Sequence, residues 1–233
     1  MLDLEELLVY SKQICLPDIT LEGQLKLKKS SVAIVGVGGL GCAILPYLAA
    51  AGIGRIGLID HDHIELSNLA RQLLFQNSDA GKPKVAIAAE RLSPSFPKVC
   101  FEPYFECLNA ENALSLLQPY DLIIDATDNS ASRYCIDKAC ELLKKPWIYG
   151  SIHHWEGHVA LFTSKENNYR SLFPNGSQEE QDCSGGVIGA FVGCVGMIQA
   201  IETIKWLAEM PETLANKLLI INGKTWRFNT FEF

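Results

Sequence analysis

A glycine-rich turn near the start of the chain could bind a phosphate. Residues Ser31–Gly41 read SVAIVGVGGLG, and Gly36, Gly38 and Gly41 have the spacing G-x-G-x-x-G. Between a strand and a helix, such a turn presents backbone N–H groups at a helix N-terminus, where donors and the helix dipole stabilise an anion. Asp60 ends the next expected strand, where a carboxylate can bind ribose hydroxyls. The pattern predicts a nucleotide site; a turn needed only for packing is the alternative.

A second polar cluster follows Asp60 directly. The segment DHDHIELSNLARQ, residues 60–72, places Asn68, Arg71 and Gln72 near the crevice at the carboxyl ends of the strands. The sequence GKPK, residues 81–84, adds two lysines at a helix N-terminus, where cations are unfavourable unless something negative is bound there. A solvated charged loop is the alternative, but its link to a phosphate-binding turn favours a ligand site.

A third cluster is DLIIDATDN, residues 121–129. Asp128 comes just past the carboxyl end of an expected buried strand, on the same rim as the other two clusters. A carboxylate beside a triphosphate would hold Mg²⁺, because it would otherwise repel the ligand. Capping of the next helix by Asp128 or Asn129 is the alternative, and the two roles are compatible.

Strands and helices alternate along most of the chain and would position these clusters. The alternation predicts a Rossmann-like α/β fold, doubly wound, with a mainly parallel sheet and a C-terminal antiparallel extension. An Asn222-Gly223 pair indicates a final hairpin, and Pro46 should kink the helix that contains it. The expected strands are 32–35, 56–59, 99–102, 121–125, 147–149 and 157–163, and the expected helices are 2–9, 20–30, 40–51, 82–92, 110–117, 131–144 and 187–209.

The composition narrows the class of protein. The net charge of −7 and the pI near 5.3 disfavour general binding to nucleic-acid backbones, which needs clustered Lys and Arg. The uncharged stretch 185–198 is shorter than the ~20 apolar residues that span a bilayer, and residues 1–13 lack the features of a signal peptide. Eight cysteines without C-x-x-C spacing are typical of reduced thiols. We therefore expect a cytoplasmic protein without nucleic-acid or membrane partners.

The run GVGGLG…DHDHIELSNLARQ…GKPK…DATDN closely resembles, in order, the ThiF/MoeB/HesA family of the ubiquitin-activating superfamily. The likeness extends from Tyr10-Ser-Lys-Gln13 to INGKTWRF near the end. The segment YRSLFPNGSQEEQDCSGGVIG favours the ThiF branch. The resemblance implies one adenylation domain over 1–233, with an N-terminal helical segment (1–30), a nucleotide-binding half (31–150) and a carrier-binding half (151–233) that contains loop 164–186.

The resemblance also implies an activity. An ATP-dependent adenylyltransferase would activate the C-terminal glycine carboxylate of a ubiquitin-like sulfur carrier as an acyl-adenylate, with release of pyrophosphate. The carrier would be ThiS-like, of the thiamine thiazole pathway, or MoaD-like, and a sulfur-donating enzyme is a further implied partner. Arg71, Lys84 and Asn68 would stabilise charge on the α-phosphate, and Asp128 would hold Mg²⁺. The implied nucleotide contacts are Gly36, Gly38, Gly39, Gly41, Asp60, Asp62, Asn68, Arg71, Gln72 and Lys84.

The chain departs from the family pattern at the zinc site. Many members hold a structural zinc with two C-x-x-C pairs; the first would fall at 168–171, which is Asn-Tyr-Arg-Ser here, and the second beyond Phe233. Because tetrahedral zinc needs four ligands, we predict no zinc site, and other packing must hold the loop. His154, Glu156 and His158 would share one face of a strand, but the family's similar strand favours a structural or substrate-facing role over a metal.

Lys12 departs from the family pattern, and Cys183 matches it but takes no part in the adenylation step. Lys12 replaces the usual Arg that reaches the ATP site of the partner subunit in a homodimer, which keeps the charge and loses the bidentate fork. Cys183 matches a loop cysteine that can bond to the carrier or transfer sulfur. The flanking Asp182 would raise the pKa of that thiol, so an inert exposed thiol is the alternative.

Two other classes of function compete with adenylation. A Rossmann oxidoreductase using NAD or FAD would share the glycine turn, but Arg71, Lys84 and Asp128 suit a triphosphate with Mg²⁺. A non-catalytic relative that only binds a carrier is favoured by the missing zinc ligands and by Lys12. NADH fluorescence on mixing distinguishes the oxidoreductase, and pyrophosphate exchange with candidate carriers distinguishes the non-catalytic relative.

Overall fold

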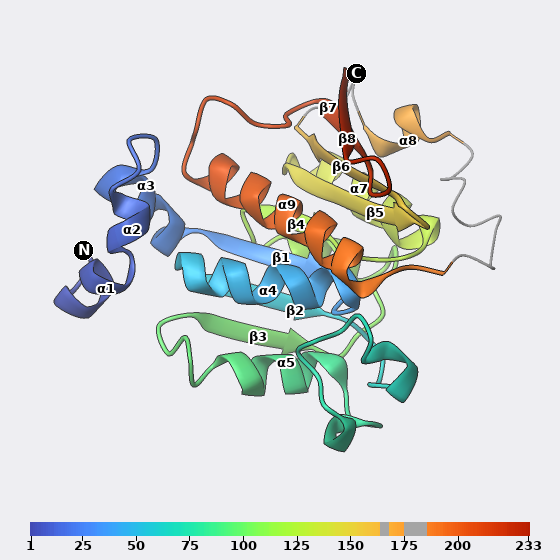
Figure 1. Ribbon diagram of the computed structural model, residues 1–233, viewed down its shortest axis with the longest axis horizontal. Coiled ribbons are helices and arrows are strands. Elements are labelled where there is room, and N and C mark those ends of the chain that lie inside the picture. Colours follow the sequence, from blue (N-terminus) through green and yellow to red (C-terminus); the bar gives the residue numbers. More distant parts are fainter. Residues whose placement is uncertain (164–167, 175–185) are drawn as a thin grey trace.

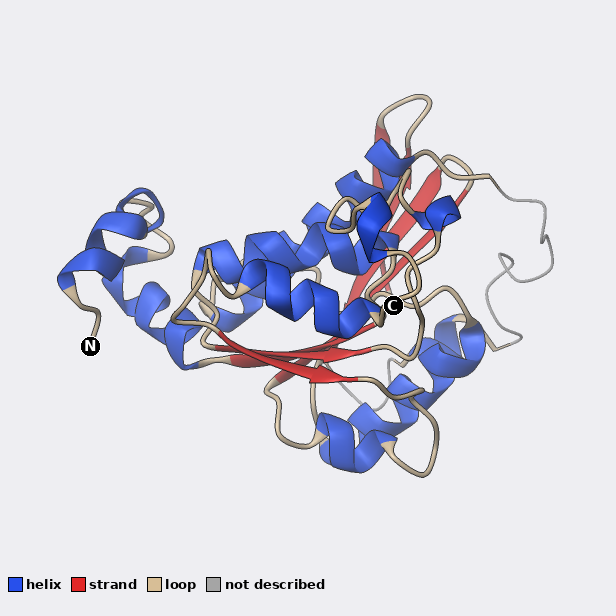
Figure 2. Ribbon diagram, turned by 90° about the horizontal axis from the view of Figure 1, so that it is seen from below, coloured by secondary structure: helices blue, strands red, loops and turns tan. Residues whose placement is uncertain are grey.

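The computed structural model describes residues 1–163, 168–174 and 186–233. Its centre is a mixed sheet in the order β3-β2-β1-β4-β5-β6-β7-β8, with helices on both faces (Figures 1 and 2). The strands are β1 (Ser31–Val35), β2 (Arg55–Ile59), β3 (Cys100–Tyr104), β4 (Leu122–Asp125), β5 (Trp147–His153), β6 (Glu156–Phe162), β7 (Lys217–Asn222) and β8 (Arg227–Glu232). The predicted Rossmann-like fold is confirmed.

The first five strands form the parallel half of the sheet. Strand β1 pairs in parallel with β2 on one side and β4 on the other, and all five of its residues are buried. Such strands read as continuous apolar runs because helices cover both faces. The chain order reverses between β1 and β4, and the crevice outside the strand ends at that point is where α/β folds bind ligands.

Two groups of helices cover the two faces. Helices α4 (Gly39–Ala51), α5 (Lys84–Leu92) and α9 (Gly189–Leu207) share one apolar core with the sheet. Helices α6 (Ala113–Leu117), α7 (Ser130–Leu143) and α8 (Tyr169–Leu172) share the other. Short helices that the sequence patterns did not indicate are α2 (Ser11–Ile14), the 3₁₀ turns η1 (Leu66–Asn68) and η2 (Asn77–Asp79), and α8, which lies within the stretch 164–186 expected to be a loop.

The last four strands are antiparallel, as predicted. Strands β7 and β8 form the expected C-terminal hairpin, with Asn222 opposite Arg227. Its turn spans residues 223–226, and the Asn222 side chain accepts hydrogen bonds from the backbone of Lys224 and Thr225. The hairpin therefore closes with a four-residue connection that follows Asn222.

The N-terminal helices lie at the far end of the sheet from the carboxyl ends of its parallel strands (Figure 1). Besides α2 they are α1 (Leu4–Val9), which begins with an Asp3 capping box, and α3 (Thr20–Lys29). The buried Gln24 amide donates to the carbonyl of Ala51, the last residue of α4. Helix α4 continues through Pro46 as one element, so it connects this end of the molecule to the glycine turn.

Helix α9 is long and apolar enough to cross a membrane by length and composition. The same features are typical of a core helix, and several α9 side chains, among them Phe191, Val192 and Val195, are buried in the main core. Figure 1 shows α9 beside α4 on one face of the sheet.

Candidate functional site

The glycine turn between β1 and α4 depends on close backbone contacts. Gly36 has a φ of +97°, and a Cβ there would lie 2.5 Å from the Ala126 carbonyl oxygen. A Cβ on Gly41 would lie 2.2 Å from the Gly36 carbonyl oxygen. Gly38 is the N-cap of α4 and supplies no capping side chain, so first-turn N–H groups of α4 lack that partner and suit an anion.

Asp60 joins the end of β2 to this turn. One carboxylate oxygen accepts a hydrogen bond from the Val37 backbone at 2.6 Å, and the other accepts from the Asp62 backbone at 2.8 Å. The side chain is largely buried. Asp60 therefore holds the turn in place, and ribose binding by the remaining lone pairs stays a prediction.

The segment that contains Arg71 and Gln72 lies against the glycine turn. The Cγ and Cδ atoms of Arg71 would be 3.5 and 3.6 Å from a Cβ on Gly39, and the Gln72 amide nitrogen 3.8 Å from a Cβ on Gly38. Gln72 is buried, and its amide oxygen has no hydrogen-bond partner in the described part of the chain. A buried amide oxygen without a partner can accept a hydrogen bond from a ligand hydroxyl or amino group, whereas the Gln72 amide nitrogen is the donor that suits a phosphate.

Asn68 and Lys84 complete this side of the site. The buried Asn68 side chain accepts a hydrogen bond from the Glu65 backbone at 3.2 Å. Its amide nitrogen donates to the Ser67 hydroxyl at 3.4 Å and has a second N–H to offer. Lys84, also buried, donates to Asp62 at 2.7 Å. This hydrogen bond from Lys84 is the main cause that lowers the pKa of Asp62. Lys82, the other lysine of GKPK, instead contacts the buried Asp79 at 3.4 Å.

Asp128 lies on the opposite side of the rim, after β4. The N-cap of α7 is Asn129, whose side chain accepts a hydrogen bond from the Ser132 backbone at 2.9 Å. Asp128 is exposed and accepts a 3.4 Å hydrogen bond from the Asn129 amide. The capping alternative therefore applies to Asn129, and Asp128 is accessible to a cation.

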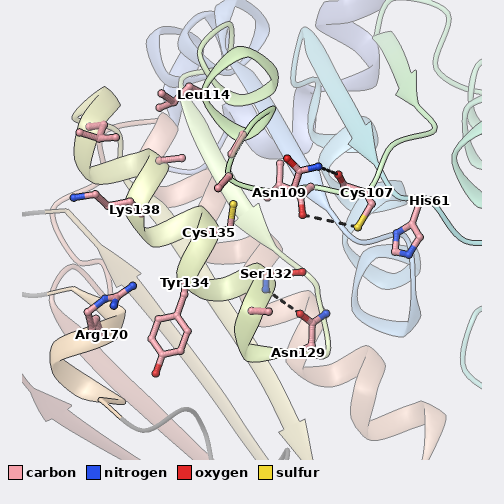
Figure 3. A pocket seen from close by; sticks show the side chains of 16 residues that line it. His61, Cys107, Asn109, Leu114, Asn129, Ser132, Tyr134, Cys135, Lys138 and Arg170 are labelled. Atoms are coloured by element: carbon pink, nitrogen blue, oxygen red, sulfur yellow. Dashed lines mark hydrogen bonds between the residues drawn. The ribbon is translucent and has the colours of Figure 1, made fainter.

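A cavity of about 610 Å³ opens between α6 and α7 and reaches the rim at His61 and Asn129 (Figure 3). No sequence pattern indicates this cavity. Its lining is largely apolar, and the segment after β3 contributes Cys107–Ala110. The short apolar pattern after β3 is the one related feature of the sequence, and such a pattern does not tell whether a cavity lies beside the segment. Other lining residues are Ala113, Leu114, Ala131, Ser132, Tyr134, Cys135, Lys138, Ala139, Leu142 and Arg170.

Comparison with known proteins identifies the family. The model of the ThiF family matches residues 10–233, almost the whole chain. The chain belongs to the ThiF family. It is 42% identical over 228 residues to the sulfur carrier protein adenylyltransferase of Thermus thermophilus. This match covers 94% of the chain and 84% of that protein.

The chain is also similar to longer members of the ThiF family. It is 44% identical over 232 residues to the adenylyltransferase and sulfurtransferase MOCS3 of Anopheles gambiae, with 98% of this chain and 53% of that protein covered. The chain therefore spans about half the length of these relatives.

Solved structures share the fold of this ThiF-family chain at lower sequence identity. The Escherichia coli protein MccB with MccA has a TM-score of 0.86 and 23% identity, covering 99% of this chain and 72% of that one. PaaA has a TM-score of 0.85 and 24% identity, covering 99% and 74%. At these identities the likeness concerns the fold.

The position at which many ThiF-family members carry their first zinc cysteines is a buried aromatic anchor here. Tyr169 is fully buried, its backbone N–H donates to the Asp137 carboxylate at 3.0 Å, and its ring lies 5.3 Å from that of Tyr149. The Tyr134 hydroxyl donates to the Phe173 carbonyl at 2.5 Å. These contacts are the packing that holds residues 168–173 without cysteine ligands.

Other predicted residues lie apart from the rim or outside the described residues. Lys12 is exposed on α2, beyond the far end of α4, whose 13 residues span about 20 Å. Cys183 lies outside the described residues. Among the described residues, Asp60, His61 and Asp62 have ligand atoms close enough together to hold a metal ion. The histidines near 154 do not form such a group in that part of the chain.

Proposed function

We propose that the chain adenylates the C-terminal glycine carboxylate of a ubiquitin-like sulfur-carrier protein with ATP and releases pyrophosphate. The observation that carries the proposal is the packing of Arg71 and Gln72 over Gly38 and Gly39. This packing lays the Arg71 stem and the Gln72 amide nitrogen against a turn whose N–H groups suit phosphate. The Arg71 guanidinium donates to the Ser67 carbonyl at 3.2 Å and would turn to the phosphates when ATP binds. The relatives are named as adenylyltransferases, one of them as a sulfur carrier protein adenylyltransferase, and these names support the same reaction.

The geometry suggests how ATP is oriented. Its phosphates would lie on the N–H groups that follow Gly38, and its ribose would contact Asp60. Its base would enter the rim end of the cavity, between His61, Leu108 and Asn129. Apolar walls with a few polar groups are typical of sites for planar ligands.

The reaction requires no protein nucleophile. A carboxylate oxygen of the carrier attacks the α-phosphorus of ATP, a new P–O bond forms, and the bond to the β-phosphate oxygen breaks, so that pyrophosphate leaves. Arg71, Lys84 and the Asn68 amide would stabilise the negative charge that develops on the α-phosphate, in a site where buried groups are strongly oriented. Asp128 would hold Mg²⁺, which neutralises phosphate charge when bound.

We further propose that the carrier docks on the C-terminal hairpin. Trp226, Phe228 and Phe231 are each more than half exposed and lie on or beside the edge strand β8. Phe228 and Phe231 lie on opposite faces of β8, because they pair with Ile221 and Leu218 of the two different cores. The docking surface is therefore the turn end of the hairpin, with Trp226 and Phe228, since exposed aromatic side chains are typical of protein-binding surfaces. We propose a ThiS-like carrier, as in thiamine thiazole synthesis; a MoaD-like carrier is the alternative that the test below distinguishes.

The position of Lys12 supports a homodimer. Within one chain α4 separates Lys12 from the glycine turn, so Lys12 would contact phosphate only in the site of a second copy. The segment 4–21, in helices α1 to α3 and the connection before α3, exposes Leu4, Leu8, Leu16 and Leu21, each by more than 40%. A second copy would cover such side chains. The described cysteines are all free thiols, which supports a cytoplasmic location for this dimer.

Pyrophosphate exchange into ATP tests the function. The protein, Mg²⁺ and ATP are mixed with labelled pyrophosphate and either a ThiS-like or a MoaD-like carrier ending in Gly-Gly. Exchange that depends on one carrier, and is lost on removal of its terminal glycine, supports the proposal and identifies the carrier. Exchange with neither carrier by a folded protein would instead favour a non-catalytic carrier-binding protein.

A further inference from the structure

One face of α9 contacts three of the segments that surround the proposed ATP site. Gly189, Val192, Gly196 and Gln199 follow one another at spacings of three and four, which puts them on one side of the helix. Together they extend over about 15 Å. Figure 1 shows α9 running beside α4 across the sheet.

The first turns of α9 lie against the Arg71 segment and the glycine turn. A Cβ on Gly189 would lie 2.3 Å from the Ala70 carbonyl oxygen and 3.2 Å from the Arg71 Cα. One turn further on, the Val192 Cγ1 would be 2.7 Å from a Cβ on Gly39, the glycine that Arg71 also contacts. Helix α9 and the Arg71 segment therefore meet backbone to backbone, with no side chain between them.

The middle of α9 holds the end of β4. The fully buried Gln199 donates from its amide nitrogen to the Asp125 carbonyl at 2.7 Å, three residues before Asp128. Gly150 on β5 leaves room for this amide, because a Cβ there would lie 2.2 Å from the amide carbon. The amide oxygen of Gln199 has no partner in the described part of the chain, so its donor side is the one that the fold uses.

We propose that α9 sets the position of Arg71 relative to Asp128, with Gly189 and Gln199 as its positioning residues. This inference rests on the proposed adenylation. Arg71 follows a 3₁₀ turn and Asp128 follows a strand, so their own elements do not join them. Helix α9 packs against both segments, so a tilt of this helix would displace Arg71 and Asp128, on either side of the α-phosphate, at the same time.

Gln199→Met tests the inference because it keeps the side-chain volume and removes the donor. Two readouts are needed. Without nucleotide, amide hydrogen exchange should rise over residues 122–133 and remain at the wild-type level over 55–60. In pyrophosphate exchange, kcat should fall roughly 10- to 100-fold, the range expected for misplacement by about 1 Å, with a much smaller change in the KM for ATP.

Gly150 provides a compensation test that separates position from packing. Gly150→Ala puts a methyl group into the Gln199 amide and should lower both Tm and kcat. Adding Gln199→Ala makes room for that methyl group, so the double variant should recover Tm while kcat stays low. Gly193→Ala is the matched control on α9, because a Cβ at Gly193 meets nothing within 4 Å; it should leave kcat unchanged and should not lower Tm.

Three outcomes would overturn the inference. They are wild-type kcat in Gln199→Met, unchanged hydrogen exchange over 122–133 in that variant, and recovery of kcat together with Tm in the double variant. A wild-type protein that exchanges pyrophosphate with neither carrier overturns the proposed function itself. The hydrogen-exchange comparison then still decides whether α9 holds the end of β4.

Discussion

The ammonium of Lys84 lies 2.7 Å from a carboxylate oxygen of Asp62, and the two side chains differ sharply in exposure. Lys84 is 7% exposed and Asp62 is 53% exposed. A buried ammonium needs a counter-charge, which Asp62 supplies in this structure, while the hydrated carboxylate is free to move when a phosphate binds. Lys84 is thus held at the rim beside Asp62, and under the proposed function the same charge would serve the ATP phosphates.

Lys84→Met should abolish most of the exchange activity and leave the fold intact. Methionine keeps the packing of the lysine stem, and Asp62 stays hydrated without its partner. Loss of an oriented charge of this kind costs about 3–4 kcal/mol of transition-state stabilisation, or roughly 10²- to 10³-fold in kcat. Lys82→Met is the matched control in the same GKPK sequence and should change kcat less than about threefold. Equal losses in the two variants would contradict the placement of Lys84.

Mixing two inactive variants tests the role of Lys12. If Lys12 of one chain acts in the site of the other, Lys12→Ala and Lys84→Met should each lack most activity. A mixed dimer holds one site with both lysines, so refolding the two variants together should restore up to about a quarter of wild-type exchange by random pairing of the chains. Pyrophosphate exchange before and after co-refolding measures this. Full activity of Lys12→Ala alone, or no recovery in the mixture, would exclude a shared site.

The long elements could be predicted from the sequence because each has a strong periodic pattern. Strand β1 is a continuous apolar run, and α7 has apolar residues at helical spacing. The short elements could not, because caps and tertiary contacts determine them. Helix α8 forms because Asn168 caps it and Tyr169 enters a buried aromatic cluster. Helix α5 begins at Lys84, two residues later than predicted, because Pro83 is its N-cap.

In the candidate site, too, some features could be predicted from the sequence and others could not. Asp60, Arg71 and Asp128 were placed on one rim because parallel strands end at the same edge of a sheet. Contacts between loops could not be predicted in that way. Examples are the ion pair of Lys84 with Asp62, the second role of Asp60 as acceptor for Val37, and the cavity between α6 and α7. Each depends on the distance between segments that no local pattern specifies.

Gly41→Ala should distort the glycine turn and destabilise the protein, whereas Gly193→Ala, in helix α9, should stabilise it. The new Cβ at Gly41 would meet the Gly36 carbonyl oxygen, which cannot move without opening the turn, so we expect a loss of about 1–3 kcal/mol in the free energy of unfolding. Gly193→Ala meets empty space inside α9 and should gain roughly 0.5–1 kcal/mol. Urea unfolding measures both. The thermal shift with ATP should vanish only in Gly41→Ala; a normal shift there would contradict the phosphate role of the turn.

Because of Asp137, the stability of the fold around Tyr169 should depend on pH in a defined direction. Its carboxylate is buried beneath α8, and this burial raises its pKa above the ordinary value of 3.8. The folded state therefore binds the proton more tightly than the unfolded state does. The resulting stabilisation is fully present below the unfolded pKa and is lost as the pH rises through the higher folded pKa.

Asp137→Asn should remove this dependence, because the amide oxygen can still accept the Tyr169 N–H and carries no charge to desolvate. The free energy of unfolding of the variant, minus that of the wild type, should increase as the pH rises from about 4 and then level off. Urea unfolding across about pH 4 to 7 measures the difference, in which the other carboxylates cancel. Asp18→Asn, at an exposed position, serves as the control and should give a flat difference. A flat difference for Asp137→Asn as well would show that burial of the Asp137 charge does not limit the stability of the anchor.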